Sequence, residues 1–142
     1  LVDPQQPAEQ SVLIKGEIKD DFCVFIILRG KRSNEIITQN FRTQLTIFER
    51  ALSSLSSGSI FHAMSANGMA VAAATGDNEA LRICNNAIAN GALSAAITGS
   101  GPAISIVCFI EDKALIEDVL RKTHYEIIET NFMKSDLIEV IE

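Results

Sequence analysis

Two kinds of apolar spacing alternate along this chain, and each predicts one kind of element. Residues 22–28 form a continuous apolar run between polar residues, which predicts a central strand of a sheet. From about Thr38 to Leu55, apolar residues recur at intervals of four, three, four and three, which places them along one face of a helix. That face consists of Phe41, Leu45, Phe48, Leu52 and Leu55.

Two more helices are expected before the next strand. An alanine-rich segment from about Ser59 to Thr75 predicts the first of them, and Gly76 closes it. Asp77 can cap the second, because a short acidic side chain accepts hydrogen bonds from the first free amides of a helix. Asn90-Gly91 ends this helix.

The rest of the chain predicts a sheet with one further helix. Apolar runs flank a loop at residues 98–103, and Asp112 is expected to cap a helix after the second run. Strands are expected at 125–130 and 137–141, with a weaker edge strand at 11–18. The order from residue 22 predicts an α+β fold, a ferredoxin-like split βαβ antiparallel sheet with helices on one face. Three helices stand where the simplest version of this fold has one.

Composition limits the classes of partner. With 142 residues, 47% of them hydrophobic, the chain can form one well-cored domain, and its net charge of −6 argues against nucleic acid or an anionic membrane as partner. No apolar run reaches the length of a membrane span, and no signal peptide is recognisable. Cys23, Cys84 and Cys108 are isolated in apolar segments, which is typical of free thiols in the cytoplasm rather than of disulfides or a metal site.

The first residues have the composition of a linker. The chain starts at Leu1 rather than Met and continues with Asp3-Pro4-Gln5-Gln6-Pro7. We therefore expect residues 1–10 to be a linker from a missing N-terminal domain, and residues 11–142 to form one domain.

The loop at residues 98–103 is the first candidate for chemistry. Glycines at 99 and 101 tolerate positive φ and leave their amides uncovered, while Thr98 and Ser100 add hydroxyls and Pro102 fixes one φ angle. Such a loop can approach a phosphate closely. The alternative is a glycine-rich hairpin connection without a binding role.

Two other clusters have both a structural and a functional interpretation. Arg29, Lys31 and Arg32 follow the first strand, where they form either a solvated turn or a site for an anionic ligand. Asn67-Gly68 interrupts the alanine-rich helix, although a glycine inside a helix costs about 1 kcal/mol relative to alanine. The pair indicates either a close helix contact or kink, or a group that faces a site.

Three short segments carry a resemblance to a known superfamily. They are Ala63-Met64-Ser65-Ala66-Asn67-Gly68, then Gly91-Ala92 before a strand, then Thr98-Gly99-Ser100-Gly101-Pro102-Ala103. Together they resemble the C-terminal domain of the galactokinase, homoserine kinase, mevalonate kinase and phosphomevalonate kinase (GHMP) superfamily. The pattern is most similar to archaeal shikimate kinases, and Ile128-Glu129-Thr130-Asn131 is similar to their closing strand. The resemblance covers about Val12 to the end of the chain.

The resemblance implies an ATP- and magnesium-dependent kinase that phosphorylates a hydroxyl of shikimate, in aromatic amino-acid biosynthesis. The superfamily's ATP loop, Pro-x-x-x-Gly-Leu-Gly-Ser-Ser-Ala, does not occur here, since the prolines are Pro4, Pro7 and Pro102. ATP and magnesium would therefore be bound mainly by the missing N-terminal domain, which becomes the chain's partner beside the small substrate. The isolated chain would be inactive, and no general base and no metal ligand is assigned from it.

Carried over residue by residue, the resemblance gives a site with two parts. The loop on the phosphate side consists of Thr98, Gly99, Ser100, Gly101 and Pro102. Candidates for the substrate cleft are Asn67, Gly68, Arg29, Lys31 and Arg32.

Two alternatives remain open. A sibling kinase for homoserine or a mevalonate derivative would share the fold and the loop. A non-enzymic regulatory module with a ferredoxin-like sheet would fit the acidic charge, although such modules usually place one helix where residues 29–93 hold three. The sequence does not determine the oligomeric state.

Overall fold

The computed structural model describes residues 5–7, 10, 18, 21–33 and 35–133. The chain divides into two units, one formed by Leu1–Asp20 with Phe132–Glu142 and the other by Asp21–Asn131. In the first unit, the Gln10 amide donates to the Pro7 carbonyl at 2.8 Å. The strand expected at 137–141 lies outside the described residues, as does the one at 11–18 apart from Ile18.

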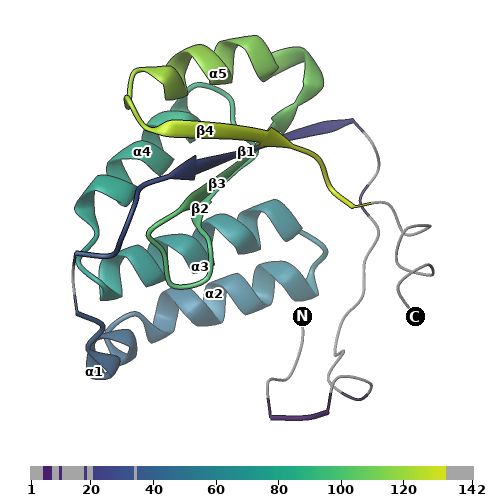
Figure 1. Ribbon diagram of the computed structural model, residues 1–142. Helices are drawn as coiled ribbons and strands as arrows, with labels where there is room; N and C mark the ends of the chain where they lie inside the picture. The colour runs from purple at the N-terminus through teal and green to yellow at the C-terminus, as the bar shows by residue number, and fades with distance from the viewer. Residues whose placement is uncertain (1–4, 8–9, 11–17, 19–20, 34, 134–142) are drawn as a thin grey trace. The chain divides into compact units, whose positions relative to one another are not determined.

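The second unit, Asp21–Asn131, holds the helices and strands described below (Figure 1). In chain order they are β1 (Phe22–Leu28), α1 (Thr38–Arg42), α2 (Leu45–Ser56), α3 (Ile60–Ala74), α4 (Asn78–Ala89), β2 (Ser94–Ile97), β3 (Ile104–Phe109), the 3-10 turn η2 (Ile110–Asp112), α5 (Lys113–Arg121) and β4 (Glu126–Thr130). None of the described helices has the length and apolar character that crossing a bilayer requires.

The single helix expected from Thr38 to Leu55 is wrong, because the structure has two helices that separate at Thr43 and Gln44. The Thr43 hydroxyl donates to the Asn40 carbonyl at 2.6 Å, and the Gln44 amide bonds the Phe41 carbonyl three residues back at 3.1 Å. Such local bonds tighten and end a helix. The apolar face continues across the break, so periodicity alone did not detect it.

The prediction that the Asp112 side chain caps a helix is also wrong, although the residue stands at the expected position. Asp112 stands at the N-cap position of α5, but its side chain makes no capping hydrogen bond, because the helix continues directly from the 3-10 turn η2. By contrast, Asp77 caps α4 as expected, since its Oδ1 accepts the Ala80 amide at 2.9 Å.

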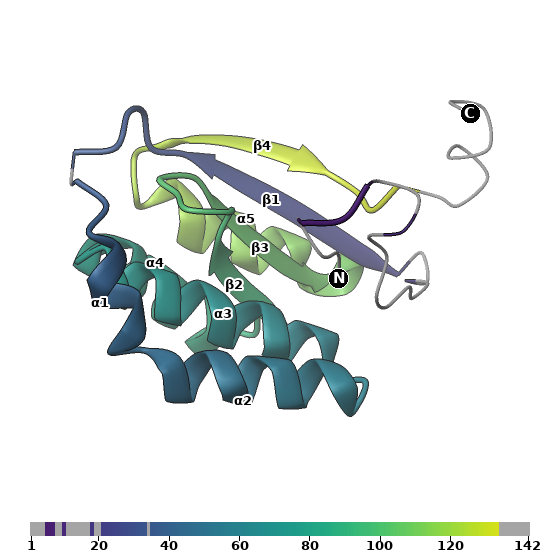
Figure 2. The ribbon, with the colours of Figure 1, turned by 90° about the horizontal axis from the view of Figure 1, so that it is seen from below.

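The sheet has four strands in the order β2-β3-β1-β4, with every neighbouring pair antiparallel (Figures 1 and 2). β1 is central, paired with β3 on one side and with β4 on the other, as its unbroken apolar run predicted. Helices connect β1 to β2 and β3 to β4, and in neither case are the two connected strands neighbours in the sheet. Two such helical connections in one antiparallel sheet make the split βαβ arrangement. The predicted α+β fold is confirmed.

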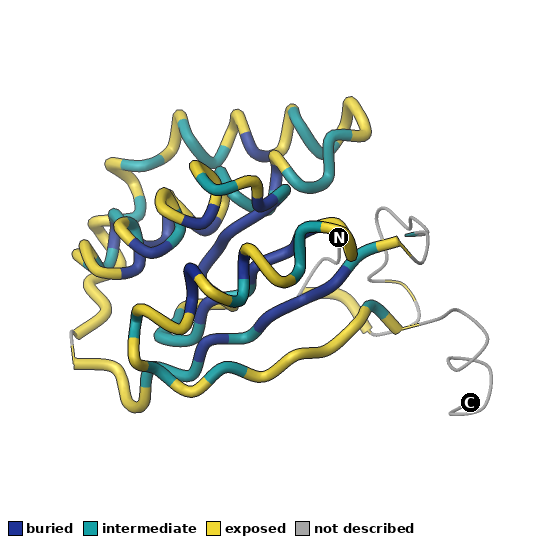
Figure 3. The backbone as a smooth tube through the Cα atoms, turned by 90° about the horizontal axis from the view of Figure 1, so that it is seen from above, coloured by how far each residue is buried: buried dark blue, intermediate teal, exposed yellow. Residues whose placement is uncertain are grey.

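The main core lies on one face of the sheet. Cys23, Phe25 and Ile27 of β1 pair with Cys108, Ile106 and Ile104 of β3, and all six are buried. Apolar residues of the helices complete this cluster, including Val71, Ile83, Ile116 and Leu120. Figure 3 shows the buried positions concentrated on three strands, β1, β2 and β3, and on the inner sides of the helices, whereas β4 is mostly exposed.

α3 covers the free edge of β2, with α2 packed beside it (Figure 2). The Ala95 amide of β2 donates to Ser65 Oγ at 3.2 Å, so a helix side chain satisfies a donor on the edge strand. Three residues further along α3, a Cβ on Gly68 would lie 2.5 Å from the Cβ of Ala96. The glycine thus allows the helix to approach the strand closely.

Candidate functional site

A cavity of about 440 Å³ lies where the end of β1, the α3–α4 turn, the 98–103 loop and the start of β4 meet. Most of its lining is polar or charged. The lining residues are Arg29, Lys31, Arg32, Ser33, Thr75, Gly76, Asp77, Asn78, Glu79, Ser100, Pro102 and Tyr125. The structure therefore brings the cations after β1 and part of the glycine-rich loop together, although they are about 70 residues apart in sequence.

The loop between β2 and β3 is closed by its own hydrogen bonds. The Thr98 amide donates to the Ala103 carbonyl at 2.9 Å, and the Gly101 amide donates to the Thr98 carbonyl at 2.9 Å. Gly99 and Gly101 have φ angles of 54° and 83°, in the region that favours glycine. Within the described part of the chain, the amides of Gly99 and Ser100 take no part in these bonds, and both residues are exposed.

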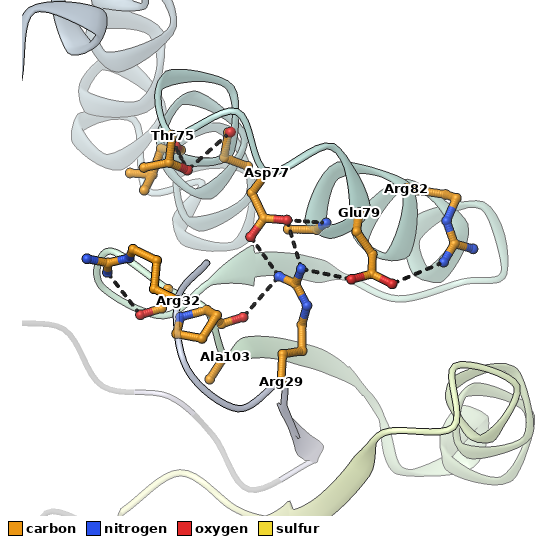
Figure 4. A network of polar contacts seen from close by, with 12 residues as sticks. Arg29, Arg32, Thr75, Asp77, Glu79, Arg82 and Ala103 are labelled. Atoms are coloured by element: carbon orange, nitrogen blue, oxygen red, sulfur yellow. Dashed lines mark hydrogen bonds and ion pairs between the residues drawn. The ribbon is translucent and has the colours of Figure 1, made fainter. Parts of the chain in front are cut away.

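Arg29 joins three segments at the wall of this cavity (Figure 4). Its Nη1 and Nη2 each donate to one carboxylate oxygen of Asp77 at 2.8 Å. Nη1 also donates to the Pro102 carbonyl at 3.1 Å, and Nη2 to Glu79 Oε2 at 3.1 Å. The side chain is only 8% exposed, and its buried Nε has no hydrogen-bond partner among the described residues. Two carboxylates thus compensate the charge of Arg29.

The carboxylates of this network are held in their ionised form. The hydrogen bond from Arg29 lowers the pKa of Asp77, and the amide of Ala80 adds to this effect. The pKa of Glu79 is lowered by hydrogen bonds from the Tyr125 hydroxyl and from Arg29. In turn, the bond to Asp77 raises the pKa of Arg29. Opposite charges in contact each favour the charged form of the other.

Lys31 and Arg32 are in a different electrostatic situation. Nη2 of Arg32 donates to Ser100 O at 2.7 Å, to Ser100 Oγ at 2.6 Å and to Gly101 O at 3.2 Å, so its partners are neutral. Lys31 is exposed and makes no hydrogen bond or ion pair with any described residue. Beside the loop, these two cations carry positive charge that no carboxylate of the described residues neutralises.

The two remaining cleft candidates do not line the cavity. Gly68 is buried against Ala96 and Ile97 of β2, where its lack of a side chain has a packing role. Asn67 is exposed on α3.

Sequence reasoning missed Asp77, Glu79 and Tyr125 as members of this network. Asp77 carried a signal, because it was expected as the cap of α4, but its pairing with Arg29 spans 48 residues. Glu79 and Tyr125 have no local pattern that distinguishes them from surface residues.

The thiols are free, as expected, and Cys23 and Cys108 are buried opposite one another on β1 and β3. Cys84 is only half-buried. Burial raises the pKa of Cys84 and of Cys108 to about 11. Among the described residues, no three His, Cys, Asp or Glu side chains gather in a way that could hold a metal ion.

No protein-family model matches this sequence. Several solved structures match its fold. A phosphotransferase related to the CoA biosynthesis pathway is 13% identical with a TM-score of 0.64, over 83% of this chain and 40% of that chain. The putative homoserine kinase thrB from Listeria monocytogenes is 11% identical with a TM-score of 0.53, over 85% and 47%. A protein called MDDEF, in complex with MVAPP, AMPPCP and magnesium, is 13% identical with a TM-score of 0.51, over 79% and 44%.

These likenesses define the fold. The chain has the α+β architecture of the C-terminal portions of GHMP-superfamily kinases and decarboxylases. It spans less than half the length of each of the three solved chains described above.

Proposed function

We propose that this chain is the C-terminal domain of a GHMP-type phosphotransferase, and that the whole protein transfers the γ-phosphoryl group of ATP to a hydroxyl of a small molecule. One observation carries the proposal. In a fold shared with such enzymes, a closed glycine-rich loop with two amides that no described residue binds lies beside Lys31 and Arg32, whose charges no carboxylate of the described residues neutralises. Backbone amides and uncompensated cations are the groups that hold phosphate oxygens.

The loop would act by positioning and by stabilising charge. In phosphoryl transfer, negative charge is spread over the equatorial oxygens, and the protein contributes mainly fixed donors and orientation. The amides of Gly99 and Ser100 would donate to phosphate oxygens, and the Thr98 hydroxyl, which donates to the Ala103 carbonyl at 3.3 Å, supports the turn. Lys31 and Arg32 would add positive charge next to these donors, and Asn67 stays a weaker cleft candidate.

ATP and magnesium would be held mainly outside this chain. Bound magnesium would supply charge neutralisation at the phosphates. The described residues would contribute donors for phosphate oxygens, as one wall of a site. The nucleotide loop and the general base would belong to an N-terminal domain.

For the acceptor we propose shikimate, on the strength of the short motifs around residues 63–68 and 98–103. A homoserine-type acceptor is the second candidate, and it is favoured by the similarity to the homoserine kinase. A mevalonate-type acceptor is the third, because 44% of the chain of mevalonate diphosphate decarboxylase from Staphylococcus aureus matches this fold with a TM-score of 0.53. The fold does not discriminate among these acceptors, so the choice rests on kinetics.

The test is ADP release by the whole protein that contains this chain, with shikimate, homoserine, mevalonate and phosphomevalonate as acceptors. We expect turnover with shikimate and none from the isolated 142-residue chain, which should still unfold cooperatively. Turnover with homoserine or a mevalonate derivative alone would keep the phosphotransferase and replace the acceptor. Absence of ADP release with every acceptor would refute the proposal in favour of a non-enzymic domain.

A further inference from the structure

Three consecutive carbonyls of the glycine-rich loop accept hydrogen bonds from two arginines. Arg32 donates to the carbonyls of Ser100 and Gly101, at 2.7 and 3.2 Å, and Arg29 donates to that of Pro102 at 3.1 Å. Both arginines come from the segment that follows β1 (Figure 4). Three bonds of one polarity fix the orientation of successive peptide units more tightly than the bonds inside the loop do alone.

Arg29 is itself held in place. Its bidentate pair with Asp77 matches the planar guanidinium fork to the carboxylate, and Asp77 is fixed in turn as the cap of α4. The contact with Pro102 therefore links the loop to a helix terminus through a rigid side chain. With only 8% of its side chain exposed, Arg29 has little freedom to turn toward a ligand.

We propose that Arg29 and Arg32 are positioning residues of the 98–103 loop: they bind its carbonyls and so leave the amides of Gly99 and Ser100 for an anionic ligand. The identity of the ligand as an anion rests on the proposed function, in which the loop lies on the phosphate side of the site. The orientation of the loop by the two arginines stands on the contacts themselves.

A direct ligand role for Arg29 is the competing interpretation. Asp77 and Glu79 already place two negative charges on this guanidinium, so a bound anion would add a third to a nearly buried site. Like charges brought together at low exposure disfavour one another. Arg32 has no carboxylate partner in the described ranges of the chain. For this residue, an experiment must separate holding the loop from binding the ligand.

The first experiment measures the backbone order of the loop by ¹⁵N relaxation on the 142-residue chain. In the unmodified chain we expect amide order parameters of about 0.85 at Ser100 and Gly101, falling below about 0.6 in Arg32→Ala. Lys31→Ala is the matched control, because it removes the same charge from the neighbouring residue, which makes no bond to the loop. Equal order parameters in both variants, or no fall in either, would overturn the role of Arg32.

The second experiment tests Arg29 without emptying its buried position. Arg29→Lys keeps the charge, but a single ammonium cannot reach Asp77, Glu79 and the Pro102 carbonyl as the guanidinium fork does. We expect hydrogen exchange of the Gly101 amide to become at least tenfold faster relative to the Ile106 amide in β3. Arg82→Lys is the control, because Arg82 pairs with Glu79 at 3.9 Å and does not touch the loop. A uniform acceleration at both amides would mean that Arg29 acts only on global stability and would overturn its role.

The outcomes separate this inference from the proposed function. If the whole protein shows no phosphotransfer while Arg32→Ala still disorders the loop, the proposed function fails and the positioning role stands. If the enzyme is active and Arg32→Ala abolishes turnover with an unchanged loop, Arg32 binds the ligand directly and the positioning role fails.

Discussion

Gly68→Ala tests how closely α3 approaches the edge strand β2. In an exposed helix, replacing glycine by alanine stabilises by about 1 kcal/mol. At this position, however, the added Cβ would lie 2.5 Å from the Cβ of Ala96, 2.7 Å from its Cα and 2.9 Å from the amide nitrogen of Ile97. Two of these atoms belong to the backbone of a paired strand, so a side-chain rotation cannot relieve the overlap.

The expected magnitude follows from the difference of the two effects. Overpacking in a well-packed core typically costs about 1–3 kcal/mol, and overlap with strand backbone belongs at the upper end. Subtracting the gain in helix propensity of about 1 kcal/mol leaves a loss of about 2 kcal/mol in the free energy of unfolding. Moving α3 away from β2 instead would lengthen the bond from the Ala95 amide to Ser65, which is already 3.2 Å.

Urea denaturation followed by circular dichroism measures this loss directly. Asn67→Ala is the matched control: the neighbouring residue is exposed on the same helix, and we expect a change within about 0.5 kcal/mol. Adding Ala96→Gly to the Gly68→Ala variant removes the shortest contact but leaves the two backbone contacts, so only part of the stability should return. A Gly68→Ala variant as stable as the unmodified chain would refute the close packing of α3 on β2.

Three further predictions concern the network, the loop and the thiols. Folding lowers the pKa of Asp77, mainly through Arg29, so the unfolded state binds the proton more readily and the free energy of unfolding should fall as the pH drops below about 4. Asp77→Asn should flatten this part of the pH profile of stability, whereas an unchanged profile would contradict the pairing. Gly101→Val places a β-branched residue at a φ of 83°, with its Cβ 3.3 Å from Ile97 Cγ2. In the proposed phosphotransferase this variant should lose most of kcat while the protein still unfolds cooperatively, and activity near that of the unmodified protein would make the loop a simple turn. The pKa values of Cys84 and Cys108 are raised to about 11, so both thiols should react with iodoacetamide at pH 8 on the order of 100-fold more slowly in the folded chain than in urea. Mass spectrometry measures both rates, and equal rates would show that burial does not protect the thiols.

Much of the fold could be predicted from the sequence because local patterns report local geometry. The apolar run at residues 22–28 has no polar alternation, and the structure places it as β1 between two neighbours, with every residue buried or half-buried. The cap at Asp77 and the glycine stop at residue 76 depend only on adjacent backbone groups, so α3 and α4 begin and end where expected. The break at Thr43 was not predicted, because the hydrogen bond from the Thr43 hydroxyl that ends α1 does not change the spacing of the apolar residues.

The candidate site was only partly predictable, because it depends on pairs that are distant in sequence. The sequence marked the glycine-rich loop and the three cations after β1, but it did not indicate that Arg29 is neutralised by Asp77 while Arg32 binds Ser100, 68 residues away. Likewise, Gly68 was recognisable as an exception in the helix pattern, but the sequence did not indicate whether a ligand or a strand lies against it. Those assignments follow from the strand order, which brings the end of β1 beside the loop and α3 against β2. Spacing along a chain determines which face a side chain occupies, and only the tertiary arrangement determines what that face meets.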